Sequence, residues 1–191
     1  MRSASLAAEL KMSDESAEAV QQRVGDFNTL SDDAAAGILR SCCGSSRWVA
    51  EMIARRPFAS IDSLLIAADE VWASTDAVDW HEAFAHHPRI GGKETVDVQS
   101  SRASAWSAAE QAATSTAGPG VQAELVSINQ QYENRFGHIY IVRASGRSAE
   151  EMLTLARQRL LNDPESELLA AAEEQRQITR LRLRKQFGGD T

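Results

Sequence analysis

His86 and His87 stand side by side at the end of an apolar helical pattern, and Pro88 follows them directly. A proline disfavours helical backbone angles in the residue before it, so we expect a helix to end at His87. Gly91 and Gly92 permit a tight turn just beyond it. An imidazole on a rigid helix end can transfer protons near neutral pH, because its ordinary pKa is about 6.5. The alternative is a histidine that only caps carbonyls at the helix end.

The same segment could in principle hold zinc through His81, Glu82, His86 and His87. His81 and His86 are five residues apart, however, and therefore do not share one helix face. The segment contains neither a His-Glu-x-x-His motif nor a cysteine pair. The sequence therefore predicts no metal site here.

A second group of reactive side chains lies in the segment 106–111, Trp-Ser-Ala-Ala-Glu-Gln. Ser107, Glu110 and Gln111 are spaced i, i+3 and i+4, which places them on one side of a helix. A hydroxyl, a carboxylate and a primary amide together can bind a ligand rich in amide or urea groups. The alternative is an ordinary solvated helix face.

The last helical pattern ends with an arginine on its apolar stripe. Steps of three and four residues define this stripe as Leu168, Ala171, Gln175, Ile178 and Arg182. Burying an unpaired guanidinium costs several kcal/mol, so an inward Arg182 implies an anionic partner. Arg180, Arg184 and Lys185 are expected to point outward as solvated charges. A snorkelling side chain at the edge of the core is the alternative for Arg182.

Helical patterns dominate the rest of the chain and predict a single all-α domain of about eight helices. Ser31, Ser148 and Asp163 are expected N-caps, and Gly44 and Gly137 are expected helix ends. The segment 138–146 is short, β-branched and aromatic, which indicates an extended connector. Helices are expected within the segments 30–44, 46–58, 60–74, 75–88, 102–116, 121–137, 148–160 and 162–187.

Composition excludes several classes of protein. The 191 residues carry a net charge of −7 and a sequence pI near 5.1, which argues against a nucleic-acid-binding surface. No run of 18 apolar residues is present, and the first residues do not resemble a secretory signal, so we expect a cytoplasmic protein without membrane contact. Cys42 and Cys43 are adjacent and are expected to be reduced and half-buried. Residues 1–25 are expected to be flexible, residues 26–187 to form the domain, and residues 188–191 to form a tail.

Several segments, in this order, resemble the OHCU decarboxylase family, which acts on 2-oxo-4-hydroxy-4-carboxy-5-ureidoimidazoline. They are FNTLS (27–31), CCGSSRWVAEMIARRPF (42–58), AHHPRIGGK (85–93), SAAEQ (107–111), YENRFGHIYIV (132–142) and LRLRK (181–185). The resemblance covers roughly residues 27–187. The His-Pro-Arg-Ile-Gly segment followed by a Ser-x-x-Glu-Gln helix is its most specific part.

This resemblance implies a cofactor-free, all-α enzyme that forms (S)-allantoin in the last step from urate and is usually a homodimer. It implies that His87, rather than His86, is the catalytic histidine, with Glu110 and Arg182 as further catalytic residues. It also implies that Pro88, Ser107 and Gln111 contact the substrate. The backbone of a strand-like segment would line the pocket, formed here by Tyr140, Ile141, Val142, Arg143 and Ala144.

Two other functions remain open from the sequence. The chain could be a helical interaction domain without catalytic activity that uses the basic cluster at 180–185. It could instead be a hydrolase or isomerase that uses the same histidine and glutamate on a related ureido compound. A binding module of the first kind would lose affinity steeply with salt.

Overall fold

The computed structural model describes residues 17–89 and 117–188. Regular secondary structure in these two ranges is helical and includes no strand, which confirms the all-α prediction. A first helix occupies residues 17–29. It is followed by α2 (Asp32–Cys42), α3 (Ser46–Ala54), α4 (Ile61–Ala73), α5 (Ala77–Ala85), α8 (Pro119–Phe136), α9 (Ala149–Arg159), α10 (Pro164–Leu183) and the π-helical η1 (Arg184–Gly188).

Short polar side chains start most of these helices. Each accepts a hydrogen bond from a backbone N–H of the first turn, which would otherwise lack a partner. Helix α8 instead follows Gly118 with a proline at its first position, and it ends at Gly137, whose φ of 75° is left-handed. The capping residues are Ser31, Ser45, Ser60, Asp76, Ser148 and Asp163, which include all three caps expected from the sequence.

The first helix corrects the boundary that we expected at residue 25. Residues 17–25 are helical rather than flexible, and Val24 is fully buried, as is Phe27 one turn later. Val20, Val24 and Phe27 are spaced i, i+4 and i+7, the pattern of one apolar helix face. Val24 and Phe27 belong to the larger core, so this apolar face holds the first helix against the rest of the molecule.

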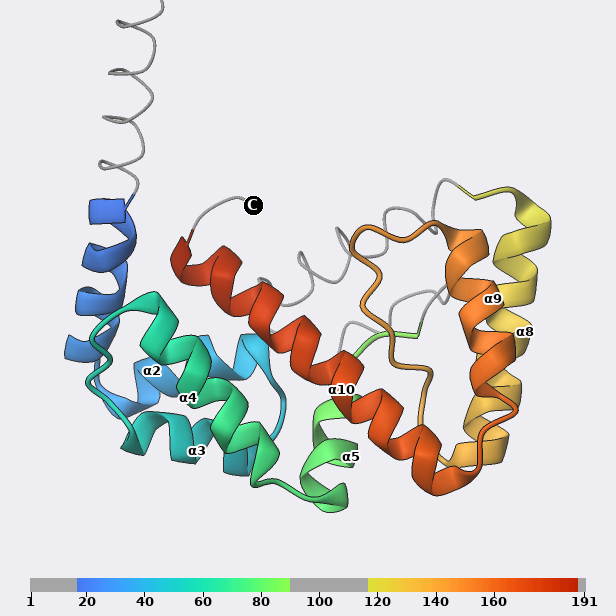
Figure 1. Cartoon of the computed structure of the whole chain (residues 1–191), viewed down its shortest axis with the longest axis horizontal. Helices are drawn as coiled ribbons and strands as arrows, with labels where there is room; N and C mark the ends of the chain where they lie inside the picture. The colour runs from blue at the N-terminus through green and yellow to red at the C-terminus, as the bar shows by residue number, and fades with distance from the viewer. Residues whose placement is uncertain (1–16, 90–116, 189–191) are drawn as a thin grey trace, which may run out of the picture.

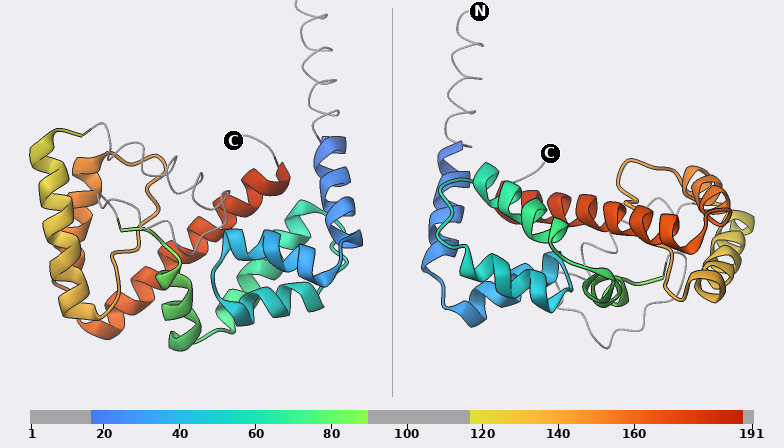
Figure 2. Two further views of the ribbon diagram at one scale, coloured as in Figure 1. Left: turned by 180° about the vertical axis from the view of Figure 1, so that it is seen from behind. Right: turned by 60° about the horizontal axis from the view of Figure 1, so that its bottom comes forward.

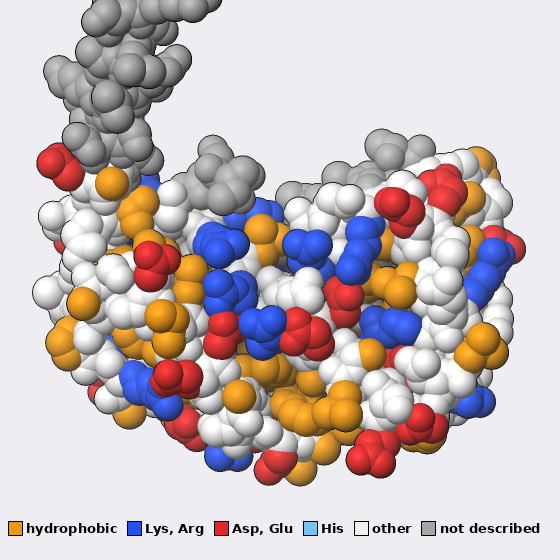
Figure 3. All heavy atoms as spheres, viewed as in Figure 1, with side chains coloured by type: hydrophobic (Ala, Val, Ile, Leu, Met, Phe, Trp, Pro, Cys, Tyr) orange, Lys and Arg blue, Asp and Glu red, His pale blue; other side chains and the backbone are white. Residues whose placement is uncertain are grey.

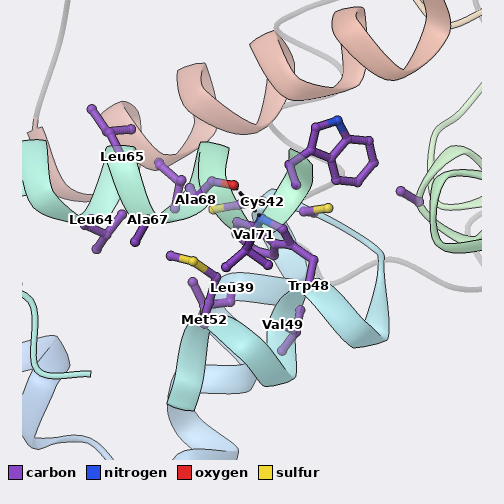
Figure 4. Close-up of a cluster of buried hydrophobic side chains, with 14 of the residues drawn as sticks. Leu39, Cys42, Trp48, Val49, Met52, Leu64, Leu65, Ala67, Ala68 and Val71 are labelled. Carbon is purple, nitrogen blue, oxygen red and sulfur yellow. Dashed lines mark hydrogen bonds between the residues drawn. The ribbon is translucent and has the colours of Figure 1, made fainter. Parts of the chain in front are cut away.

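Helices α2, α3 and α4 surround the larger of two hydrophobic cores (Figure 4). Trp48 is its largest fully buried side chain, and its indole N–H donates to the carbonyl of Ala68 at 3.1 Å. This bond joins α3 to α4 and satisfies the one polar group of the indole. Neither Cys42 nor Cys43 forms a disulfide, and both are fully buried here, rather than half-buried as we expected.

Helix α10 crosses the molecule from the α2–α4 group to the pair α8 and α9 (Figures 1 and 2). The smaller core lies between α8 and α9, and the connector 138–144 passes between the two cores. Side chains along the connector alternate, as they do in any extended chain. Ile139 and Ile141 join the larger core, whereas Tyr140, Val142 and Ala144 join the smaller one. The extended connector predicted from the sequence is therefore present.

A buried ion pair fixes the connector to the helices around it. Arg159 on α9 donates from Nε to Glu167 of α10 at 2.9 Å. Its other nitrogens donate to the carbonyl of Ile141 at 2.7 Å and to the hydroxyl of Tyr132 on α8 at 3.0 Å. Buried charges persist when their hydrogen-bonding groups are satisfied in this way. One guanidinium thus joins α8, α9, α10 and the connector.

Helix α5 is attached to the start of α3. Glu82 on α5 accepts hydrogen bonds from the backbone N–H of Ser46 at 2.8 Å and from the Ser46 hydroxyl at 2.6 Å. Desolvation raises the pKa of Glu82, but the Ser46 hydrogen bonds and the positive charge of Arg40 outweigh it and lower the pKa. The carboxylate is therefore ionised at neutral pH and holds the two helices together.

His86 completes this attachment. Its Nδ1 lies 2.9 Å from the carbonyl of Glu82, and its ring lies against the backbone of Gly44 between α2 and α3. A Cβ on Gly44 would lie 2.4 Å from Cγ of the ring. Gly44 is thus needed for this close approach, in addition to following the end of α2. The last turn of α5 can lie here only because residue 44 has no side chain.

We predict that Gly44→Ala destabilises the protein by about 1–3 kcal/mol, because the methyl group must push away the His86 ring. Gly37→Ala is the matched control. Gly37 lies inside α2, and a Cβ there meets nothing within 4 Å. Its replacement is expected to stabilise the protein by about 0.4–1 kcal/mol. Urea unfolding curves measure both, and equal stabilities for the two variants would contradict the contact.

Candidate active site

His87 is the first residue beyond the cap of α5. The helix ends at Ala85 with His86 as its C-cap, and the backbone N–H of His87 donates to the carbonyl of Phe84 at 3.0 Å. Pro88 follows, so the chain cannot continue as a helix. The helix end predicted from the sequence is confirmed. His86 and His87 are both partly buried, but His86 contacts Glu82 and Gly44, whereas His87 lies near α10.

Helix α10 packs against α5 and presents a buried polar strip. We define this strip as Gln175, Thr179 and Arg182, which are 0%, 4% and 4% exposed. Their spacing of i, i+4 and i+7 places them on one helix face. Nε2 of Gln175 donates to Oγ1 of Thr179 at 3.2 Å. The inward position that the helical count indicated for Arg182 is therefore present.

His87 contacts this strip. Burial lowers the pKa of its imidazole to about 3, and the positive charge of Arg182 adds to the effect. The amide of Gln175 opposes the shift as a hydrogen-bonding group, but its effect is smaller, and His86 adds a minor contribution in the lowering direction. Both main causes disfavour the charged form and favour the neutral ring.

Cys43, between α2 and α3, lies next to the same strip. Burial raises the pKa of its thiol to about 11, although hydrogen bonds from Ser45 and Thr179 and the charge of Arg182 oppose the rise. Only a thiolate is a strong nucleophile. Cys43 is thus a neutral polar group beside Thr179 and Arg182 rather than a reactive cysteine.

Some backbone groups of the connector already have hydrogen-bond partners. The carbonyl of Ile141 accepts from Arg159, and the N–H of Arg143 donates to Glu174 at 2.6 Å. In an extended chain, backbone groups of alternate residues point to opposite edges. The N–H and C=O of Val142 therefore point to the edge away from Arg159 and Glu174. Among the described residues we find no hydrogen-bond partner for these two groups.

Several sequence predictions fall elsewhere. Ser107, Glu110 and Gln111 lie outside the described residues. Of the other predicted residues, the structure brings His87 and Arg182 together, with Pro88 adjacent to His87 in the chain. Thr179 and Cys43 were not predicted as part of a site. The available signal for Gln175 was a polar residue on an otherwise apolar stripe.

The four residues considered for zinc do not converge on one point. The carboxylate of Glu82 binds Ser46, and His86 faces the Glu82 carbonyl. His81 is exposed and contacts the rings of Phe84 and His138. Within residues 17–89 and 117–188, no group of three potential ligands is arranged to hold a metal ion.

Part of the basic cluster at 180–185 is paired with an acid, and basic and acidic side chains lie close together over α10 in Figure 3. Arg180 is half-buried and pairs with Asp69, rather than pointing into solvent as we expected. Arg176 pairs with the same carboxylate at 3.0 Å, and Arg147 pairs with Glu174 at 2.9 Å. Positive and negative side chains therefore alternate over α10, which does not favour binding to a polyanion.

A search of the described helices finds none that is both long and apolar enough to cross a lipid bilayer.

Comparisons with known proteins agree with this arrangement. A solved structure, of OHCU decarboxylase in the presence of (S)-allantoin, is similar to this chain with a TM-score of 0.68 and 32% identity. The match covers 83% of this chain and 99% of that one. The 2-oxo-4-hydroxy-4-carboxy-5-ureidoimidazoline decarboxylase of Amia calva is 31% identical over 130 residues, which are 67% of this chain and 73% of that protein.

The uric acid degradation bifunctional protein TTL of Arabidopsis thaliana is 36% identical over 146 residues. These are 76% of this chain but only 45% of the plant protein, so the chain spans less than half of that relative. The family model described as OHCU decarboxylase matches residues 28–184, which is most of the chain. The protein therefore belongs to the OHCU decarboxylase family.

Proposed function

We propose that this protein decarboxylates 2-oxo-4-hydroxy-4-carboxy-5-ureidoimidazoline to (S)-allantoin without a cofactor. The observation that carries the proposal is the buried guanidinium of Arg182, whose positive charge acts on His87 in a chain of this family. The names of the Amia calva relative and of the solved structure supply the substrate and the product. A small anionic molecule fits a site that joins one buried positive charge to one neutral proton carrier.

The reaction needs an electron sink that the substrate itself provides. The bond to the carboxylate breaks, CO2 leaves, and the electron pair moves into the ring toward the adjacent imine. A proton must then reach one face of the ring to give a single enantiomer of allantoin. The protein's task is to orient the carboxylate, balance the moving charge and carry the proton.

His87 is assigned to the proton transfer. Because burial and Arg182 favour the neutral ring, His87 can accept a proton from the substrate hydroxyl before it donates one to the ring carbon. Arg182 disfavours the imidazolium. A substrate carboxylate beside Arg182 would offset that charge and raise the pKa of His87, so that proton uptake follows substrate binding.

The remaining contacts follow from the family resemblance and from the connector. Glu110 would hold His87 or the ureido nitrogens, and Ser107 and Gln111 would align the amide edges. Pro88 would contact the substrate next to His87. The N–H and C=O of Val142 offer a donor and an acceptor, which suit a ring amide. This edge of the connector is then held in place by its other residues, Tyr140, Ile141, Arg143 and Ala144.

A second candidate function is a helical interaction domain without catalysis. The ion pair of Arg180 with Asp69 weakens this alternative, because it engages one positive charge of the cluster that would bind a polyanion. A hydrolase or isomerase acting on a related ureido compound would use the same imidazole. The products of the following experiment distinguish all three.

We predict that His87→Ala lowers kcat at least about 10²-fold, because general acid–base catalysis contributes about 10²–10⁴-fold. The substrate is generated in situ from urate with urate oxidase and the preceding hydrolase, and circular dichroism follows the optically active product. Wild-type protein is expected to give one allantoin enantiomer rapidly. Slow racemic decay with wild-type protein would contradict the proposed reaction.

His86→Ala is the matched control for this variant. The neighbouring ring contacts Glu82 and Gly44, so its loss is expected to affect stability more than kcat. Full activity in His87→Ala, or equal losses of kcat in the two variants, would remove His87 from the proton transfer.

We predict that Arg182→Met raises KM about 10–100-fold, because a hydrogen bond to a charged group contributes about 1.5–3 kcal/mol. Arg180→Met is the control, since Arg180 pairs with Asp69 on a neighbouring face of the same helix. Its KM is expected to change less than about threefold. Steady-state kinetics in the coupled assay measures both, and an unchanged KM in Arg182→Met would refute substrate anchoring.

The homodimer and the cytoplasmic location that we expected from the sequence stay predictions. Size-exclusion chromatography with light scattering measures the first.

A further inference from the structure

Gln175 has an unusual place for a long polar side chain. It is fully buried on α10, which packs against α5. Its Nε2 donates to Thr179, whereas its Oε1 is buried and accepts no hydrogen bond from the residues that the structure describes. Leaving such an acceptor unsatisfied costs about 1–3 kcal/mol, so native proteins rarely do so without a function.

The imidazole of His87 carries a ring proton that suits this acceptor. The Gln175 amide lies close enough to that ring to act on its ionisation as a hydrogen-bonding group. The two side chains come from different helices, α10 and the end of α5.

Thr179 determines which end of the Gln175 amide faces His87. Its hydroxyl oxygen accepts the N–H of Gln175 at 3.2 Å, so the nitrogen end of the amide faces Thr179. The amide oxygen must therefore point away from Thr179.

We infer that Gln175 is a positioning residue whose Oε1 accepts the ring N–H of His87 and keeps the ring proton on the side of α10. This inference rests on the function proposed above. The other ring nitrogen then has no proton, and it is the one that can accept a proton from the substrate. Thr179 holds the amide in the required orientation.

An amide suits this task better than a carboxylate would. The charged and titratable groups that face His87 from the described residues are Arg182 on α10 and His86 on its own helix end. A carboxylate at residue 175 would stabilise the imidazolium against both of them. An amide oxygen orients the ring and leaves it neutral.

The test compares Gln175→Leu and Gln175→Glu with wild type in the coupled assay. Gln175→Leu is expected to lower kcat about 10–100-fold with KM changed less than about threefold, since losses of this order follow removal of an orienting partner. Gln175→Glu keeps an acceptor, so it is expected to retain more activity than Gln175→Leu. In the plot of kcat/KM against pH for Gln175→Glu, the low-pH limb is expected to shift to higher pH by at least about one unit.

Gln177→Leu is the matched control on the same helix. Gln177 donates to Glu173 at 2.9 Å on the outer face, so its replacement is expected to leave kcat and the pH profile unchanged. A Gln175→Leu variant that folds and has the kinetics of wild type would overturn the inference. If that variant does not fold, a pH profile unchanged in Gln175→Glu would overturn it.

A measurement without substrate separates this inference from the proposed reaction. Long-range ¹H–¹⁵N spectra of the resting protein report which nitrogen of each imidazole carries the proton, with His87 assigned by its loss in His87→Asn. Wild type is expected to have one tautomer at His87, and Gln175→Leu a mixture. Equal tautomer populations in both proteins would contradict the role of Gln175, whether or not wild type is a decarboxylase.

Discussion

The neutrality of the His87 ring is the constraint on which the proposed chemistry depends. Partial burial at the end of α5 lowers the pKa of the imidazole, and the positive charge of Arg182 adds to the effect. A histidine under both influences keeps a lone pair at neutral pH and becomes a stronger base only when an anion joins it. In the proposed reaction, one electrostatic contact therefore links substrate binding to proton transfer.

The rest of the described fold holds these two groups at a fixed separation. Glu82 attaches α5 to α3, and Gly44 allows the last turn of α5 to approach closely. Helix α10 carries Arg182 in the same rigid element that packs on both cores. Arg159 joins α10 to the connector through Glu167, so the backbone of Val142 has a defined direction. Elements that are distant in sequence therefore meet through a few satisfied polar contacts.

Local patterns predicted much of this arrangement. The caps Ser148 and Asp163 could be predicted from the residues of the first helical turn, and the end of α5 could be predicted from Pro88. The inward position of Arg182 follows from counting helical turns. Contacts between distant segments could not be predicted in this way. Neither the contact of His86 with Gly44 nor that of Thr179 with Cys43 has a local signal, because each depends on how helices pack. The helix over 17–29 had a signal in Val20, Val24 and Phe27, but its polar surroundings concealed it.

The most direct test of this account is an NMR titration of the His87 ring in the wild-type protein without ligand. The account predicts that the His87 resonances, assigned with His87→Asn, show an unprotonated ring from pH 7 down to at least about pH 5, well below the ordinary midpoint of about 6.5. A midpoint near 6.5 would mean that neither burial nor Arg182 acts on the imidazole, and it would contradict the account.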